Sequence, residues 1–166
     1  NAADGLWGVN VQQKRWPFIN QITYEFLNTT SQSGPLHDKD GLVFAGRDSY
    51  YENSAYPQGW TYFSGVIGNP YLQPTNSRVR AHFVGIAGDI YGYTYRMMAS
   101  YVDNYGRYRQ PFYSHNTALL LEINRCLKKV WGMEFGIAFS ADLGTQYGNQ
   151  FGALLTIRKQ GIIGKW

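Results

Sequence analysis

The feature that most constrains the fold of this chain is an alternation of apolar and polar residues with a period of two. Between Met133 and Asp142, one parity reads Met, Phe, Ile, Phe, Ala and the other reads Glu, Gly, Ala, Ser, Asp. Successive side chains of a β-strand point to opposite faces of a sheet, so the pattern indicates a strand with one apolar face. We find no amphipathic helix of convincing length.

The alternation recurs and predicts about eight strands, most of them near the 9–11 residues that cross a bilayer. The other segments are Leu6–Gln13, Ile22–Phe26, Trp60–Gly68, Arg78–Ala87, Tyr91–Tyr101, Leu119–Asn124 and Phe151–Arg158. Turn signals separate them, notably Gly88-Asp89 and Lys128-Lys129, and a longer loop is expected over Asp103–His115.

The segment from Asn28 to Gly59 shows little alternation and is expected to be a functional loop, or to hold a short strand around Leu42–Phe44. In bacterial barrels the long loops face outside and the short turns face the periplasm. With a periplasmic C-terminus, this strand count places the long segment on the side of the short turns. One missing strand in this region would repair the parity.

Composition separates the fold classes that alternation leaves open, because a soluble sandwich and a membrane barrel share the pattern. Aromatic residues make up 17% of the chain and charged residues only 16%, against roughly 25% in ordinary soluble domains. Tyrosines gather near the predicted strand ends, and the chain closes on Trp166. We predict an all-β fold, an antiparallel transmembrane β-barrel, with a soluble β-barrel or sandwich binding module as the alternative.

Several other classes of protein are disfavoured. The net charge is +4 without a run of Lys or Arg, so no nucleic-acid partner is expected. The lone Cys126 can form no internal disulfide, and no apolar stretch is long enough for a transmembrane helix. His37-Asp38-Lys39-Asp40-Gly41 lacks the twelfth-position acid of an EF-hand and is interpreted as a polar turn, so no metal or cofactor is predicted.

The stretch Gly46–Pro70 carries a distinctive motif. Its characteristic positions are Asp48, Tyr50, Tyr51, Tyr56, Gly59, Trp60, Tyr62, Gly65, Gly68 and Pro70. This stretch resembles the Wzi-type capsule-assembly outer-membrane proteins in the form common in Bacteroides-like bacteria, with Asn53 where that family has His. The motif covers about 25 of the 166 residues.

The resemblance implies that residues 1–166 are one barrel domain, or the C-terminal segment of a larger barrel, with a long loop at about 29–59. It implies a protein of the Gram-negative outer membrane that binds or organises capsular polysaccharide without catalysis. The expected partners are surface polysaccharide, outer-membrane lipid, and the missing barrel strands or another outer-membrane chain.

Aromatic rings pack on the C–H faces of sugars, and carboxylate or amide groups bond hydroxyls, so the motif supplies a predicted carbohydrate-binding set. Its members are Asp48, Tyr50, Tyr51, Asn53, Tyr56, Trp60 and Tyr62. The alternative interpretation is that these rings only pack the loop against the rim of the barrel. Binding residues commonly lie on loops that a rigid scaffold positions.

A second predicted set lines the lumen of the barrel: Arg78, Arg80, Arg96, Glu122 and Glu134. These residues would attract an anionic polymer, or would form internal ion pairs, because charges inside a lumen must be paired or hydrated.

An enzyme is the alternative function, namely a small outer-membrane barrel that acts on lipid or glycolipid. Its candidate triad is His82, Ser100 and Glu134, but neither a Gly-x-Ser-x-Gly nor a His-Glu-x-x-His motif is present. No catalytic residue is predicted.

Overall fold

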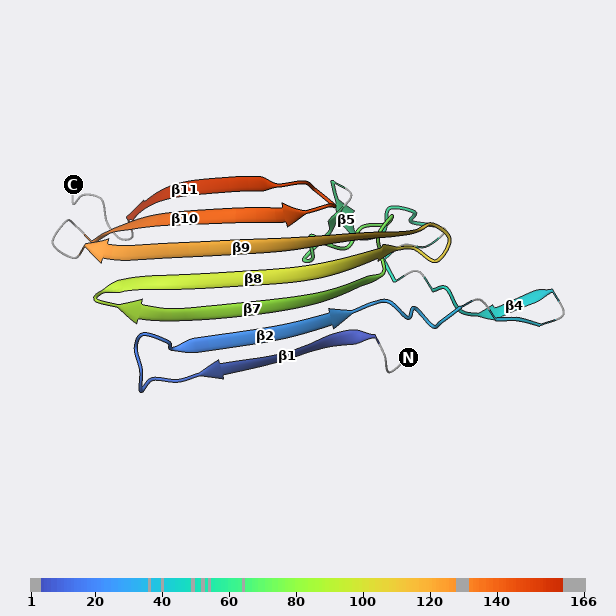
Figure 1. The fold of residues 1–166 in the computed structure, drawn as a ribbon, viewed down its shortest axis with the longest axis horizontal. Helices are drawn as coiled ribbons and strands as arrows, with labels where there is room; N and C mark the ends of the chain where they lie inside the picture. The colour runs from blue at the N-terminus through green and yellow to red at the C-terminus, as the bar shows by residue number, and fades with distance from the viewer. Residues whose placement is uncertain are drawn as a thin grey trace, which may run out of the picture.

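The computed structural model describes residues 4–35, 37–39, 41–48, 50–51, 53, 55–63, 65–127 and 132–159. Every regular element in these residues is a β-strand, and the strands pair antiparallel (Figure 1). None of the described residues forms a helix long and apolar enough to cross a membrane. The expected turn at Lys128-Lys129 and the terminal Trp166 lie outside the described residues.

Seven strands form one long twisted sheet in the order β1-β2-β7-β8-β9-β10-β11 (Figure 1). They are β1 (Gly5–Gln12), β2 (Gln21–Asn28), β7 (Val79–Ile90), β8 (Tyr93–Gly106), β9 (Pro111–Leu127), β10 (Met133–Gly144) and β11 (Gln150–Lys159). The all-β prediction is confirmed. The sheet is open in the described part of the chain, with β1 and β11 as its edges, so the closed barrel is not confirmed.

Two small hairpins complete the strand set. β3 (His37–Lys39) pairs with β4 (Leu42–Ala45), which confirms the short strand expected around Leu42. β5 (Thr61–Tyr62) pairs with β6 (Gly65–Val66). The expected strand Trp60–Gly68 is therefore wrong as a strand of the main sheet, because its residues fold back on themselves after two residue pairs.

Two turns predicted from sequence are also displaced. Gly88 and Asp89 lie inside β7, and the chain reverses at Tyr91 and Gly92, which have φ of 50° and 80°. Positive φ at both positions is the geometry of a type I′ hairpin, whose twist matches that of the strands. The expected loop Asp103–His115 is mostly strand, since β8 runs to Gly106 and β9 begins at Pro111.

The connections divide between two ends of the sheet. At the loop end lie the 50 residues between Asn28 and Val79, the β8–β9 connection and the β10–β11 connection. At the turn end lie the connections β1–β2, β7–β8 and β9–β10. The long segment thus lies at the same end of the sheet as the other loops. The strand count from sequence placed it at the opposite end because that count included Trp60–Gly68 as a spanning strand.

The two faces of the sheet differ in chemistry. We call one the apolar face. It is formed by Trp7, Val9, Val11, Ile22, Tyr24, Phe26, Val84, Ile86, Ile90, Tyr93, Tyr95, Met97, Leu119, Leu121, Ile123, Phe135, Ile137, Phe139, Phe151, Leu155 and Ile157. Most of these side chains are exposed, from 39% for Tyr24 to 79% for Phe151, and the others are half-buried.

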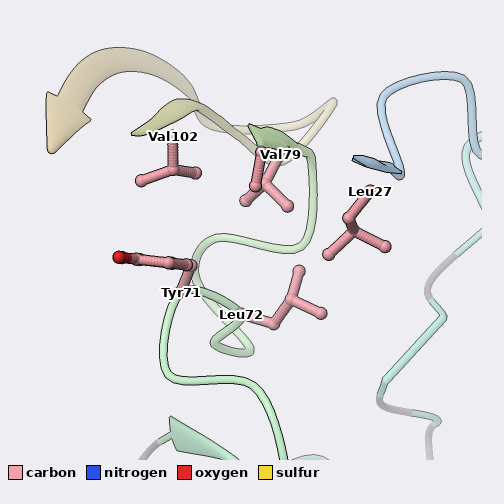
Figure 2. Close-up of a cluster of buried hydrophobic side chains, with 6 residues drawn as sticks. Leu27, Tyr71, Leu72, Val79 and Val102 are labelled. Atoms are coloured by element: carbon pink, nitrogen blue, oxygen red, sulfur yellow. The ribbon is translucent and has the colours of Figure 1, made fainter. Parts of the chain in front are cut away.

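The opposite face is mixed, and part of the long segment folds back onto it. We call residues 69–77 the strap and this side of the sheet the strap face. Tyr71 and Leu72 of the strap pack against Leu27, Val79, Ala81 and Val102 to form a buried cluster (Figure 2). Complete burial of one such side chain contributes roughly 1.5–3 kcal/mol, so this cluster fixes the strap to the sheet.

Polar bonds hold the strap as well. Asn76 donates from Nδ2 to the Tyr71 carbonyl at 3.0 Å and to Asn104 Oδ1 at 2.6 Å. Its own Oδ1 accepts the Gly106 amide at 3.1 Å. Asn104 donates onward to Gln146 Oε1 at 2.7 Å, which links the strap to the β10–β11 connection. Buried polar groups are stable only when bonded in this way.

Candidate carbohydrate-binding site

The base of the long segment is tied to the N-terminal edge of the sheet through Asp4. Its carboxylate accepts the amides of Ser31 at 2.9 Å and Gln32 at 2.7 Å, and the hydroxyl of Tyr50 at 2.6 Å. Burial alone would raise the pKa of Asp4, but the bonds from Tyr50, Ser31 and Gln32 outweigh it and lower that pKa. Asp4 therefore serves as an anchor for both ends of the 31–50 stretch.

Tyr50 and Asp48, two predicted sugar ligands, are exposed, but both form hydrogen bonds with other residues of the chain. Burial and the hydrogen bond to Asp4 raise the pKa of Tyr50 to about 12. Asp48 accepts a hydrogen bond from Ser33 Oγ, and its amide donates to the Gln32 carbonyl at 3.0 Å. Both side chains hold the segment together.

Tyr51 and Asn53 also serve the structure of the segment. Tyr51 packs against the buried cluster under the strap, and burial raises its pKa. Asn53 Oδ1 accepts the amides of Ala55 at 3.0 Å and Tyr56 at 2.9 Å, which closes a local turn. Asn side chains commonly stabilise turns in this way.

The remaining three predicted ligands are rings that stand mostly in solvent. Tyr56, Trp60 and Tyr62 are 71%, 75% and 73% exposed, and Phe63 beside them is 90% exposed. The rings of Tyr62 and Phe63 meet edge to face with centroids 4.6 Å apart. We call these four residues the aromatic tip.

The aromatic tip is built on the β5–β6 hairpin. Thr61 pairs with Val66 and Tyr62 with Gly65, while the Ile67 amide donates to the Trp60 carbonyl at 3.1 Å. The Gly59 amide donates to the Tyr56 carbonyl at 2.9 Å, which connects the first ring to the hairpin. Phe63 sits at the reversal with φ of 46°.

The structure thus divides the predicted set of seven residues. Asp48, Tyr50 and Asn53 form hydrogen bonds within the protein and Tyr51 packs against the buried cluster, whereas the rings of Tyr56, Trp60 and Tyr62 stand open to a ligand. Phe63 was missed, because its neighbours had been assigned to a strand of the sheet. The sequence signal for Phe63 was its position directly after Tyr62 in a Gly-rich stretch.

The predicted lumen residues are divided as well. On the strap face, Arg96 donates from Nε to Glu122 Oε2 at 2.5 Å, and Arg158 Nη1 lies 3.9 Å from Glu134 Oε2. The two predicted glutamates therefore have internal arginine partners, one of which, Arg158, was not in the predicted set. Both pairs are largely exposed, so each is worth about 1 kcal/mol at most.

Arg78 and Arg80 do not join these pairs. Arg78 lies at the loop end, where its guanidinium covers the ring of Tyr108 at 4.0 Å and donates to the Thr30 carbonyl at 2.9 Å. Arg80 lies directly opposite Asp103 of β8 in the strand register. Its side chain points to the face opposite that of its neighbour Ala81, which is the apolar face. In this part of the chain, the parity that begins with Arg78, Arg80 and His82 continues with Val84. One face of β7 is therefore polar at the loop end and apolar further along, which is why the sequence pattern predicted that Arg80 lines the lumen.

A hollow of about 620 Å³ lies on the strap face next to Pro70 and Tyr71. Phe83, Met98 and Leu120 form its apolar floor, and Glu25, Arg96 and Asp142 supply charge. The Tyr71 hydroxyl lies 2.5 Å from Ser100 Oγ at the same place. The strap thus covers one end of the hollow.

The three residues considered for catalysis do not assemble. His82 lies on the apolar face, where Nδ1 is 2.9 Å from the Tyr24 hydroxyl. Ser100 lies on the strap face against Tyr71, and Glu134 faces Arg158 near the turn end. Within the described ranges, no three His, Cys, Asp or Glu residues gather as metal ligands, and Asp40 lies outside those ranges.

Comparisons with known proteins give no family assignment. No protein-family model matches the chain, and neither a curated protein nor a solved structure matches it. The resemblance of Gly46–Pro70 to the Wzi-type proteins therefore stays a prediction.

Proposed function

We propose that this chain is part of an outer-membrane β-barrel that binds or organises surface polysaccharide, such as a capsule, without catalysis. The observation that carries the proposal is the aromatic tip, where four rings stand exposed on a segment braced at its base. Exposed rings cost solvation free energy unless a ligand or partner covers them. Sugars are ligands of the right chemistry, because aromatic rings pack on the C–H faces of sugars.

The apolar face supports the membrane part of the proposal. Outer-membrane strands alternate apolar and polar residues, with the apolar side chains turned to lipid and aromatic girdles at both borders. On β8, Tyr93 and Tyr95 lie toward the turn end, and Tyr101 and Tyr105 lie toward the loop end. A soluble module would need to cover this face, whose side chains are widely exposed.

The direction of the edge strands supports a barrel larger than the seven strands described. Because neighbours alternate in direction, β1 and β11 run the same way. A closed, all-antiparallel barrel needs an even number of strands, so an odd number of further strands would complete it. An eight-stranded barrel is filled by side chains, so a lumen that also holds the strap requires more than eight.

Affinity electrophoresis through gels that contain purified capsular polysaccharides tests the binding function. Trp60→Ala should weaken retardation by the recognised polymer about tenfold, because a central ring of a binding site commonly contributes 1–2 kcal/mol. Trp16→Ala is the matched control, since Trp16 is also exposed but lies in the β1–β2 connection at the turn end.

Equal retardation of wild type and Trp60→Ala by every polymer would refute the proposal that the aromatic tip binds polysaccharide. The membrane part has its own test. A purified chain that stays folded and monomeric in plain buffer would refute placement of the apolar face in lipid.

A further inference from the structure

Arg80 is a cation on the apolar face at the loop end of the sheet. It lies directly opposite Asp103 of β8, and His82 and Val84 follow it on the same face. Its side chain is exposed. Between this level and Arg125 near the turn end, the residues of β7 and β8 on this face include no Asp, Glu, Lys or Arg.

Asp103 does not neutralise Arg80. Opposite charges directly across an antiparallel pair usually interact. Here Asp103 Oδ1 instead accepts the hydroxyls of Tyr101 at 3.0 Å and Tyr113 at 2.8 Å. Among the described residues, the guanidinium of Arg80 has neither an ion pair nor a hydrogen bond. Arg80 is therefore available to an anion from outside the protein.

The height of Arg80 on the sheet indicates where that anion lies. On β8, the stretch from Tyr93 to Asp103 covers ten residue steps, which is roughly 34 Å along the strand and roughly 26 Å along the membrane normal at the tilt of about 35–45° of outer-membrane strands. This is close to the apolar band of about 25 Å in outer-membrane barrels. Asp103 and the opposite residue Arg80 lie two residue steps beyond Tyr101 and therefore at the border of this band, near the level of the lipid phosphates.

The other border of the band provides a comparison. Arg125 pairs with Tyr93 at the turn end, where its guanidinium lies 4.4 Å from the ring centroid and donates to the hydroxyl. Arg125 is thus satisfied within the protein. Among the described strand residues of the apolar face, the arginines are Arg80 at the loop end and Arg125 at the turn end, and of these two Arg80 has no partner.

We infer that Arg80 binds a phosphate group of the lipid leaflet on the loop side of the membrane. The guanidinium offers two parallel N–H donors that match phosphate geometry, and the tyrosines beside it suit the interfacial level. The inference rests on the proposed membrane placement and is independent of polysaccharide binding.

Native mass spectrometry of the chain in detergent, titrated with two lipids of identical acyl chains, tests this inference. Phosphatidic acid carries the phosphate and diacylglycerol lacks it. Wild type should prefer phosphatidic acid, and Arg80→Gln should weaken its binding roughly fivefold without changing diacylglycerol binding. Arg80→Lys should retain part of the preference, because it keeps the charge but loses the planar fork.

Two controls separate this role from others. Arg158→Gln makes the same charge change on the strap face and should leave the preference intact. Asp103→Asn should also preserve the preference for phosphatidic acid. If Arg80 served only to pair with Asp103, neither Asp103→Asn nor Arg80→Gln would change the choice of lipid.

An Arg80→Gln chain with wild-type lipid preference would overturn the inference and leave the membrane placement standing. A chain that retains neither lipid would overturn both. If Arg80→Gln instead abolished retardation by polysaccharide with lipid binding unchanged, Arg80 would belong to the carbohydrate site and the lipid inference would fail.

Discussion

Leu72 and Ile67 lie five residues apart in one segment, yet Leu72 is 3% exposed and Ile67 is 57% exposed. Leu72 belongs to the strap and packs on the sheet, whereas Ile67 directly follows the β5–β6 hairpin, which carries the exposed rings of the aromatic tip. Both stretches contain Tyr, Pro, Gln and Thr beside an aliphatic residue, so these residue types do not predict which stretch is buried. The difference lies in the partners: the strap meets Val79 and Val102, and the tip meets mainly its own hairpin.

Truncation of the aliphatic side chains gives the sharpest test of this contrast. Leu72→Ala should lower the free energy of unfolding by about 3 kcal/mol, because it opens a cavity in the buried cluster. Ile67→Ala should change it by less than about 0.5 kcal/mol. Urea unfolding in detergent, followed by tryptophan fluorescence, measures both. Equal effects of the two substitutions would contradict the division into strap and tip.

The two asparagines of the segment extend the comparison to polar groups. Asn76→Ala should cost about 2 kcal/mol, since the buried Tyr71 carbonyl and Gly106 amide each lose a partner. Asn53→Ala removes bonds in an exposed turn and should cost well under half as much. The same unfolding assay applies, and a larger loss in Asn53→Ala would show that the turn, and not the strap, stabilises the segment.

The smallest expected effect is the pH response of the base of the segment. The folded pKa of Asp4 lies below its ordinary value of 3.8, so its contribution is complete above about pH 4 and is lost as pH falls through the folded pKa. Hydrogen-exchange protection of the Ser31 and Gln32 amides should therefore decrease below pH 4. Asp4→Asn should show reduced protection that no longer varies in this range, and unchanged protection would contradict the anchor role.

Sequence alternation predicted most of the strand set because those strands have one apolar and one mixed face. It failed where both faces are polar. Asn104 at the end of β8 is buried by Asn76 and Gln146, so a polar residue occupies a position that burial would usually reserve for an apolar one. The ends of β8 and β9 therefore read as a loop.

The aromatic motif identified the segment but not the role of each ring. Tyr51 and Tyr62 are the same residue type in the same motif, and only tertiary contacts make one a packing residue and the other an exposed one. Arg80 and Arg96 differ in a similar way, since their faces follow from strand register. Register depends on where a turn falls, and the turn at Tyr91 was displaced from its expected position by a few residues.

The 50-residue connection between β2 and β7 has a consequence for folding kinetics. All other neighbouring strands of the sheet are joined by short connections, so β7 to β11 can form by local hairpin steps. Pairing of β2 with β7 closes a loop that costs about 2 kcal/mol more in chain entropy than a four-residue turn.

The strap offsets this cost because it buries Leu72 and Tyr71 between Leu27 of β2 and Val102 of β8. Ordering of the segment and docking of the first hairpin thus become a single late cooperative event. Substitutions in the strap should accelerate unfolding of β1 and β2 while β7 to β11 stay paired.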